Sequence, residues 1–209
     1  MLYIKQKGSV GYTIVGSPTI VDGIVSNFSS SNYLLFNSTI DTGKSFEFIT
    51  DITTGSNTNY QTIFGSSEAF IFRLTVSDSH KIQIQAGNGS SFGSEIKGTT
   101  TITANNSYQV KVLYDGQNMI VYLKPRNGSW SEEINTNVGS LPTFTPRIGS
   151  YYTSSYTFRG SIDLNQTYIT VNGQAWFGVC PVEVKQILLN SNDVQNLVVN
   201  GVQVWQKPS

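Results

Sequence analysis

Short runs in which apolar and polar residues alternate are the feature of this chain that most restricts its fold. Lys81–Ala86 alternates strictly, Tyr108–Tyr114 alternates as far as Val112 and is followed by the apolar run Met119–Leu123, and Ser45–Thr50 and Phe70–Val76 follow the pattern closely. Successive side chains of a β-strand point to opposite faces, so each run predicts a strand with one face in a core and the other in water. Many of these residues are β-branched or aromatic, which suits a pleated surface.

The segments between the runs have the composition of turns. Asp115–Asn118 contains Asp-Gly, a strong hairpin signal, so Tyr108–Tyr114 is expected to pair antiparallel with Met119–Lys124. Ser77–His80 joins two further strands. No segment has a sustained 3.6-residue apolar repeat, and the best helix candidate is one turn near Ser191–Leu197. The pattern predicts an all-β sandwich or barrel.

Composition excludes several classes of function. Only 12% of the 209 residues are charged and the formal net charge is +0. Without a basic excess we expect no nucleic-acid partner, and without a polybasic or amphipathic segment we expect no membrane insertion. One cysteine, Cys180, rules out an internal disulfide, and Met1–Gly8 lacks the apolar stretch of a signal peptide. We therefore expect a soluble protein that folds in a cytoplasm.

Two parts of the chain are distinguished. Residues 1–180 are expected to form the sandwich, and residues 181–209 a C-terminal strand or hairpin that closes the sandwich or is attached to it. Asn200-Gly201, flanked by Leu197–Val199 and Val202–Trp205, favours the hairpin.

Three segments carry a resemblance to a known family. Val21–Phe28 with Asn32–Phe36 forms an opening strand region, Phe158–Phe177 contains Phe-x-Gly-Ser-Ile-Asp-Leu and then Tyr-Ile-x-Val-Asn-Gly, and Val199–Trp205 ends the chain. In these segments the chain resembles the laminin-G-like, concanavalin A-like sandwich of bacteriophage structural proteins, over roughly residues 19–178 together with the C-terminal tail. The resemblance implies an antiparallel jelly-roll sandwich in a virion protein: a fibre, tail or capsid-decoration component. It further implies other virion proteins as partners and a homo-oligomer, with a trimer favoured.

Residues for catalysis are sparse. Related folds hydrolyse glycosides with paired carboxylates on one strand, but no Glu-x-Asp-x-Glu pattern exists here. Glu132 and Glu133 are expected to be solvated in a loop and to point apart. His80 is expected to be a solvated turn residue and Cys180 a small buried one. We therefore predict no catalytic residue, no cofactor and no enzyme; two carboxylates that converge in a cleft would revive the glycoside hydrolase alternative.

Calcium was considered as a ligand because some laminin-G-like domains hold it at the sandwich rim. Asp51, Asp78 and Asp115 are the candidate oxygen donors, but each has a plain turn interpretation and no dense acidic loop occurs. No metal site is predicted.

Two loops have the composition of a carbohydrate site, which needs a flat aromatic ring with amides or hydroxyls nearby. One ends in Trp130, and the other contains Tyr151, Tyr152 and Tyr156 in a Ser/Thr-rich stretch. These four residues are the candidate carbohydrate-binding residues. In the alternative interpretation the rings pack at the sandwich edge or against another subunit.

The leading hypothesis is a non-enzymatic bacteriophage virion protein, located in the virion and assembled in the host cytoplasm, that could aid attachment to the host surface. The alternative is a carbohydrate-binding module that recognises host-surface glycans.

Overall fold

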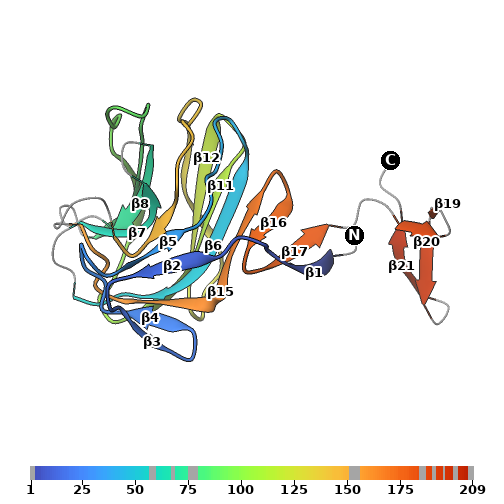
Figure 1. Ribbon diagram of the computed structural model, residues 1–209, viewed down its shortest axis with the longest axis horizontal. Coiled ribbons are helices and arrows are strands. Elements are labelled where there is room, and N and C mark those ends of the chain that lie inside the picture. The colour runs from blue at the N-terminus through green and yellow to red at the C-terminus, as the bar shows by residue number, and fades with distance from the viewer. Residues whose placement is uncertain are drawn as a thin grey trace.

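Two antiparallel sheets stacked face to face make up the body of the protein (Figure 1). The computed structural model describes residues 3–56, 60–66, 69–74, 80–150, 156–183, 187–189, 192–194, 196–199 and 202–206, and every regular element in these ranges is a β-strand. The antiparallel all-β fold class is therefore confirmed.

The first sheet, called the back sheet below, has seven described strands in the order β10 (Ile96–Thr101), β9 (Lys81–Ala86), β8 (Phe70–Leu74), β7 (Gln61–Ser66), β14 (Arg147–Ile148), β5 (Tyr33–Phe36) and β2 (Tyr12–Val15). The second, called the front sheet, runs β13 (Ser131–Asn137), β12 (Asn118–Pro125), β11 (Ser107–Tyr114), β6 (Phe46–Thr53), β15 (Ser161–Val171), β4 (Ile24–Ser26) and β3 (Thr19–Val21), with β16 (Gln174–Phe177) also paired to β15. Consecutive strands pair at one end of each sheet, whereas β14 lies between β7 and β5, and β6 lies between β11 and β15, so strands distant in sequence become neighbours, as in a jelly roll.

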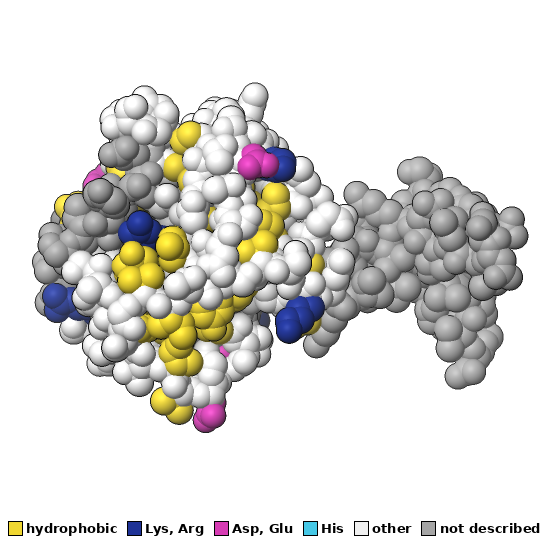
Figure 2. All heavy atoms as spheres, viewed as in Figure 1, with side chains coloured by type: hydrophobic (Ala, Val, Ile, Leu, Met, Phe, Trp, Pro, Cys, Tyr) yellow, Lys and Arg dark blue, Asp and Glu magenta, His cyan; other side chains and the backbone are white. Residues whose placement is uncertain are grey.

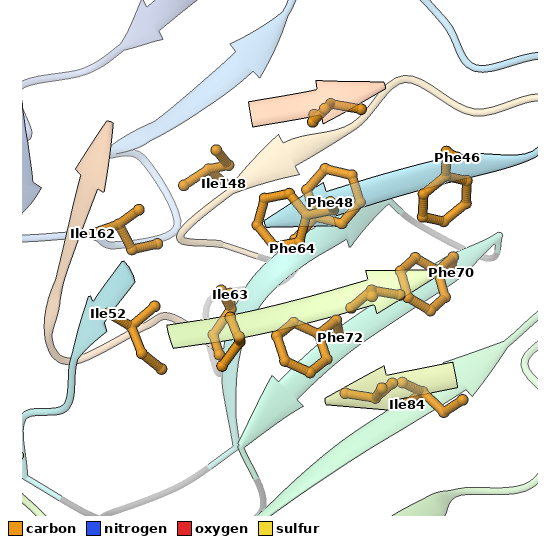
Figure 3. Close-up of a cluster of buried hydrophobic side chains, with 14 of the residues drawn as sticks. Phe46, Phe48, Ile52, Ile63, Phe64, Phe70, Phe72, Ile84, Ile148 and Ile162 are labelled. Carbon is orange, nitrogen blue, oxygen red and sulfur yellow. The ribbon is translucent and has the colours of Figure 1, made fainter. Parts of the chain in front are cut away.

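The core lies between the sheets and is rich in phenylalanine (Figure 3). Phe48 of the front sheet stacks on Phe64 of the back sheet, with ring centroids 4.2 Å apart and planes 11° from parallel. Phe46 and Phe70 surround this pair, and all four side chains are buried. Each such side chain stabilises the fold by about 2 kcal/mol relative to an exposed one. The alternating runs supply this core with every second residue.

The central hairpin is confirmed. β11 pairs antiparallel with β12, from Tyr108 opposite Pro125 to Tyr114 opposite Met119. The carboxylate of Asp115 accepts hydrogen bonds from the backbone nitrogens of Gln117 and Asn118, at 2.9 and 2.7 Å, which fixes the turn. β8 and β9 also pair antiparallel, while residues 75–79 between them lie outside the described residues.

The C-terminal part forms paired strands. β17 (Val179–Glu183) pairs with β1 (Tyr3–Lys7) in a two-stranded ribbon that leaves the sandwich (Figure 1). β18 (Ile187–Leu189) pairs with β19 (Asn192–Val194), and β20 (Asn196–Val199) with β21 (Val202–Gln206). The last pair is the hairpin expected around residues 200 and 201. The helical turn expected near residues 191–197 is wrong, because β19 and β20 cover the described part of that segment and one isolated turn is a costly helix nucleus.

Cys180 lies on β17, so the expected division of the chain at residue 180 falls inside a strand. The side chain of Cys180 is buried, as expected. Its Sγ donates weak hydrogen bonds to the carbonyl oxygens of Ile169 and Phe177, at 3.3 and 3.2 Å. In the described ranges no helix is long and apolar enough to cross a membrane.

Glu133 corrects one expectation. It does not lie in a solvated loop but on β13, where a register shift turns two consecutive residues, Glu133 and Ile134, toward the interior. Its carboxylate accepts five hydrogen bonds, from the backbone and hydroxyl groups of Thr99 and Thr100 on β10 and from the hydroxyl of Ser131. Glu132 points away and is exposed, so the expectation that the two carboxylates diverge is confirmed.

Candidate functional site

The outer face of the front sheet carries a row of polar side chains in register. Asp163, Asp51, Gln109 and Lys124 lie directly opposite one another on β15, β6, β11 and β12. We call these four residues the polar rung. Their neighbours along each strand, such as Val110 and Leu123, are buried in the core, so the alternation of the strands turns the rung outward.

The two aspartates of the polar rung lie opposite each other, and each accepts a hydrogen bond from the chain. Gln109 Nε2 donates to Asp51 Oδ1 at 2.7 Å, and the backbone nitrogen of Asn165 donates to Asp163 Oδ1 at 2.9 Å. Burial raises the pKa of Asp51 above its ordinary value and the charge of Asp163 adds to this, while the hydrogen bond from Gln109 and the charge of Lys124 oppose it. Two like charges directly opposite each other in a sheet are destabilising. Carboxyl groups whose pKa is shifted by burial and by a neighbouring charge are common at functional sites.

A groove lies over the polar rung. Its volume is about 360 Å³, and Ser107, Ser161 and Arg126 line it together with the rung residues. A second hollow of about 520 Å³ adjoins it around Arg126 and Asn127. The groove thus offers hydroxyl, amide, carboxylate and cationic groups in one place.

Aromatic rings stand beside the groove on the next rung, where Lys111 of β11 faces Tyr122 of β12. Lys111 Nζ lies 4.9 Å from the ring centroid of Tyr122 and 5.2 Å from that of Trp130, and Lys124 Nζ lies 5.9 Å from Trp130. Trp130 is 38% exposed, so a large part of its ring is available to a ligand.

Tyr156 lies on the opposite side of the molecule from Trp130. Its ring packs edge-on against Tyr60 and lies 5.5 Å from the guanidinium carbon of Arg73, a residue on the outer face of the back sheet. The structure therefore does not bring Trp130 and Tyr156 together. Tyr151 and Tyr152 lie outside the described residues.

The back sheet contains a row of three polar residues that are buried. Thr62, Arg73 and Gln83 lie opposite one another on β7, β8 and β9 and are all buried. Arg73 Nη2 donates to Glu95 at 2.7 Å and to Gln85 at 3.1 Å. Thr62 Oγ1, Arg73 Nε and both amide atoms of Gln83 have no hydrogen-bond partner among the described residues. This cluster is enclosed, unlike the groove of the front sheet.

The candidate metal ligands are dispersed. Asp115 caps its own turn, Asp51 faces Asp163, and Asp78 lies outside the described residues. Among the residues that the structure describes, no three His, Cys, Asp or Glu side chains are grouped as metal ligands. His80 has a φ of +50° and is half-buried, so the expected turn position is confirmed but full solvation is not.

The sequence named Trp130 as a candidate, and the structure places it beside the polar rung, which the sequence did not predict. The search for catalytic pairs considered positions i and i+2 or i+4 on one strand, whereas Asp51 and Asp163 come from two neighbouring strands. The alternation of β11 does predict that Gln109 and Lys111 lie together on the outer face of the sheet. The register between strands, which brings the aspartates together, is not visible in that pattern.

Comparison with known proteins supports the fold. No protein-family profile and no curated protein sequence matches the chain. Domain 4 of AbnA, a GH43 extracellular arabinanase from Geobacillus stearothermophilus, in complex with arabinotriose, aligns with a TM-score of 0.55 at 13% identity, over 81% of this chain and 82% of that one. The enzymatically active domain of tailspike protein 2 from bacteriophage CBA120 aligns with a TM-score of 0.55 at 10% identity, over 84% of this chain but only 30% of that one. The Ca²⁺/Man-bound exoplasmic/lumenal domain of VIP36 aligns with a TM-score of 0.50 at 11% identity, over 83% and 90%.

These likenesses and the strand order define the class of fold. The chain is a concanavalin A-like, lectin-like β-sandwich. At these identities they show the fold and leave the function to be argued from the site.

Proposed function

We propose that this protein binds glycans through the outer face of its front sheet, and that it does so as a non-enzymatic component of a bacteriophage virion that attaches to the host surface. The observation that carries the proposal is the exposed ring of Trp130 beside a groove lined by carboxylates, an amide, hydroxyls and cations.

The chemistry of the groove suits a sugar. Sugar rings present apolar C–H faces that stack on an aromatic ring, and hydroxyls that both donate and accept hydrogen bonds. Asp51 and Asp163 accept hydrogen bonds, Lys124 donates them, and Ser107 and Ser161 do both. Open, shallow grooves that combine aromatic and polar groups favour chain-like ligands over small enclosed ones.

The test is binding of the purified chain, displayed multivalently, to a panel of bacterial surface glycans, with and without EDTA. We expect binding that Trp130→Ala weakens about 10-fold, from the loss of stacking. Tyr156→Ala is the matched control, since its ring lies over the other sheet, and it should leave binding unchanged. A panel without any bound glycan, or equal binding by the Trp130→Ala variant, contradicts the proposal. Loss of binding in EDTA reveals a cation requirement.

The virion assignment is supported by the sequence resemblance described above and by the likeness in fold to a tailspike domain. We further propose a homo-oligomer, with a trimer favoured, that contacts other virion proteins. Apolar side chains are exposed on the end strands of the two sheets, Ile14 on β2 and Ile20 and Val21 on β3, and Ile24 is exposed on β4 next to β3. Figure 2 shows hydrophobic side chains at the surface of the sandwich. Exposed edge strands with β-branched residues are sites of association. Light scattering should show an oligomer that Val21→Lys dissociates; a monomer at high concentration contradicts this part.

A glycoside hydrolase is the second candidate, because two carboxylates do meet in the groove. Directly opposite residues in an antiparallel pair have Cβ atoms about 5 Å apart, close to the separation of about 5 Å between carboxyl groups in retaining glycosidases. Both aspartates already accept hydrogen bonds from the chain, which favours binding over turnover. Release of reducing sugar from a bound glycan, abolished by both Asp51→Asn and Asp163→Asn, would establish the hydrolase; binding without release supports the lectin-like role.

A further inference from the structure

Charges on the outer face of the front sheet are segregated by strand. Lys111 lies on β11, Lys124 on β12, and Arg126 follows the end of β12. Acidic residues lie on the strands to either side, with Asp51 on β6 and Glu132 on β13. The cations thus form a band along the β11–β12 pair.

The cations follow one another along the β11–β12 pair. Lys111 occupies the rung of Tyr122 and Lys124 the next rung, and Arg126 lies in the turn that follows β12. Successive residues on one face of a strand are two apart, so Lys111 and Lys124 lie about 7 Å from each other along the band. None of the three cations forms an ion pair with a described residue, although the charges of Lys124 and Lys111 act on Asp51 and Glu47 of β6, and these two carboxylates partly offset the positive charge of the band.

Trp130 lies within this band. The ammonium groups of Lys111 and Lys124 approach its ring at 5.2 and 5.9 Å, and Lys124 and Arg126 both line the groove. A ligand stacked on Trp130 therefore meets cationic donors on consecutive rungs. Cations that follow one another along the band match a chain in which negative charges recur.

We propose that the glycan bound by this face is an anionic linear polysaccharide, with carboxylates on its repeating units, that lies along β11 and β12 over Trp130. The inference rests on the proposed function and names its ligand class. The carboxylates contact Lys111, Lys124 and Arg126, and the hydroxyls turn toward Asp51 and Asp163.

The aspartates distinguish a polyuronate from a nucleic acid. A polyuronate and a DNA strand both carry one negative charge per unit, but the DNA backbone offers few hydroxyl donors, so it cannot offset its repulsion from Asp51 and Asp163 with hydrogen bonds. The hydroxyls of a sugar chain donate to the same carboxylates. The formal net charge of +0 for the whole chain also gives no long-range attraction for nucleic acid.

The experiment is a calorimetric titration of the full chain with oligogalacturonates of increasing length. Cello-oligosaccharides of matched length and single-stranded DNA are the comparison ligands. We expect oligogalacturonates to bind, more tightly as their length reaches the three cations, and to be weakened by added salt. Lys124→Gln and Arg126→Gln should each weaken binding about 5-fold, while Lys7→Gln, an exposed lysine on β1, has no effect.

Each outcome decides between the claims. Binding of cello-oligosaccharides but not oligogalacturonates overturns the anionic ligand and leaves the glycan-binding function standing. Binding of neither, together with an empty glycan panel, removes both. DNA bound as tightly as oligogalacturonate overturns the selectivity for sugar. Arg126 lies beyond the strand end, so its variant tests the charge even if Lys124→Gln disturbs folding.

Discussion

The carboxylate of Glu133 accepts hydrogen bonds from both the backbone nitrogen and the hydroxyl of Thr100, at 2.8 and 2.6 Å. Glu133 belongs to β13, the end strand of the front sheet, and Thr100 to β10, the end strand of the back sheet. One side chain therefore ties the two sheets together along one side of the sandwich, where the described residues of β10 and β13 share no backbone hydrogen bond.

Replacement of Glu133 by Gln should lower the free energy of unfolding by about 2 kcal/mol. The amide keeps the size of the carboxylate but puts a donor where an acceptor is needed, and hydrogen bonds to a charged group are the strong ones. Urea unfolding measures the effect. Glu132→Gln, the exposed neighbour, is the control and should change stability by less than about 0.5 kcal/mol. Equal effects of the two variants contradict the role assigned to Glu133.

The contribution of Glu133 should depend on pH. Burial by itself raises the pKa of this carboxyl, but hydrogen bonds from Thr100, Ser131 and Thr99 outweigh burial and hold the pKa below its ordinary value of 4.5. A lowered folded-state pKa gives stability that is complete above the ordinary value and is lost as the pH falls through the folded-state pKa. The difference in unfolding free energy between wild type and Glu133→Gln should therefore shrink below about pH 4.5. A difference that stays constant down to pH 3 would argue against this coupling.

Asp51→Asn should stabilise the protein at neutral pH by about 0.5 kcal/mol and weaken glycan binding at the same time. The substitution removes a like charge opposite Asp163, which favours folding. It also removes an ionised acceptor for sugar hydroxyls. Thermal unfolding and glycan binding measured on the same preparation provide the check. A variant that is less stable, or that binds as well as wild type, contradicts this assignment.

Gln83→Met should raise the free energy of unfolding by about 1 kcal/mol. The amide of Gln83 is fully buried and neither of its atoms has a hydrogen-bond partner in the described part of the chain, and an unsatisfied buried polar group costs about 1–3 kcal/mol. Methionine has nearly the same shape without the polar atoms. Gln85→Met is the matched control one rung away, and it should destabilise because Gln85 accepts from Arg73 and donates to Gly93. If Gln83→Met destabilises the protein as much as Gln85→Met does, the amide of Gln83 is hydrogen-bonded in the folded protein and the prediction is wrong.

The sequence predicts those features that depend on local periodicity. The strands around Phe48, Ile84 and Val112 follow from alternation, and the β11–β12 hairpin follows from Asp115-Gly116 between two predicted strands. Both are short-range properties, so neither requires knowledge of which strands become neighbours.

Features that depend on register could not be predicted in this way. The bulge that buries Glu133 beside Ile134 depends on the pairing of β13 with β12, whereas the sequence alone indicated a solvated loop after Trp130. Asp51 and Asp163 meet only because β6 and β15, distant in sequence, are adjacent in the sheet. In the candidate site, Trp130 was chosen because it ends a polar turn. Its separation from Tyr156 could not be predicted, because it depends on the positions of two loops: one joins β12 to β13 within the front sheet, and the other joins β14 of the back sheet to β15 of the front sheet.

The ribbon of β1 and β17 has a mechanical consequence. Tyr3 faces Glu183 at its outer end and Lys7 faces Val179 at its inner end, where Gly8 and Val10 continue the hydrogen bonding toward the sandwich. Tension that separates the outer ends peels these pairs apart one after another, instead of shearing them all together. We therefore expect the ribbon to open at a lower force than the sandwich, so a pull on its outer ends should lengthen the ribbon and leave the shape of the groove beside Trp130 unchanged.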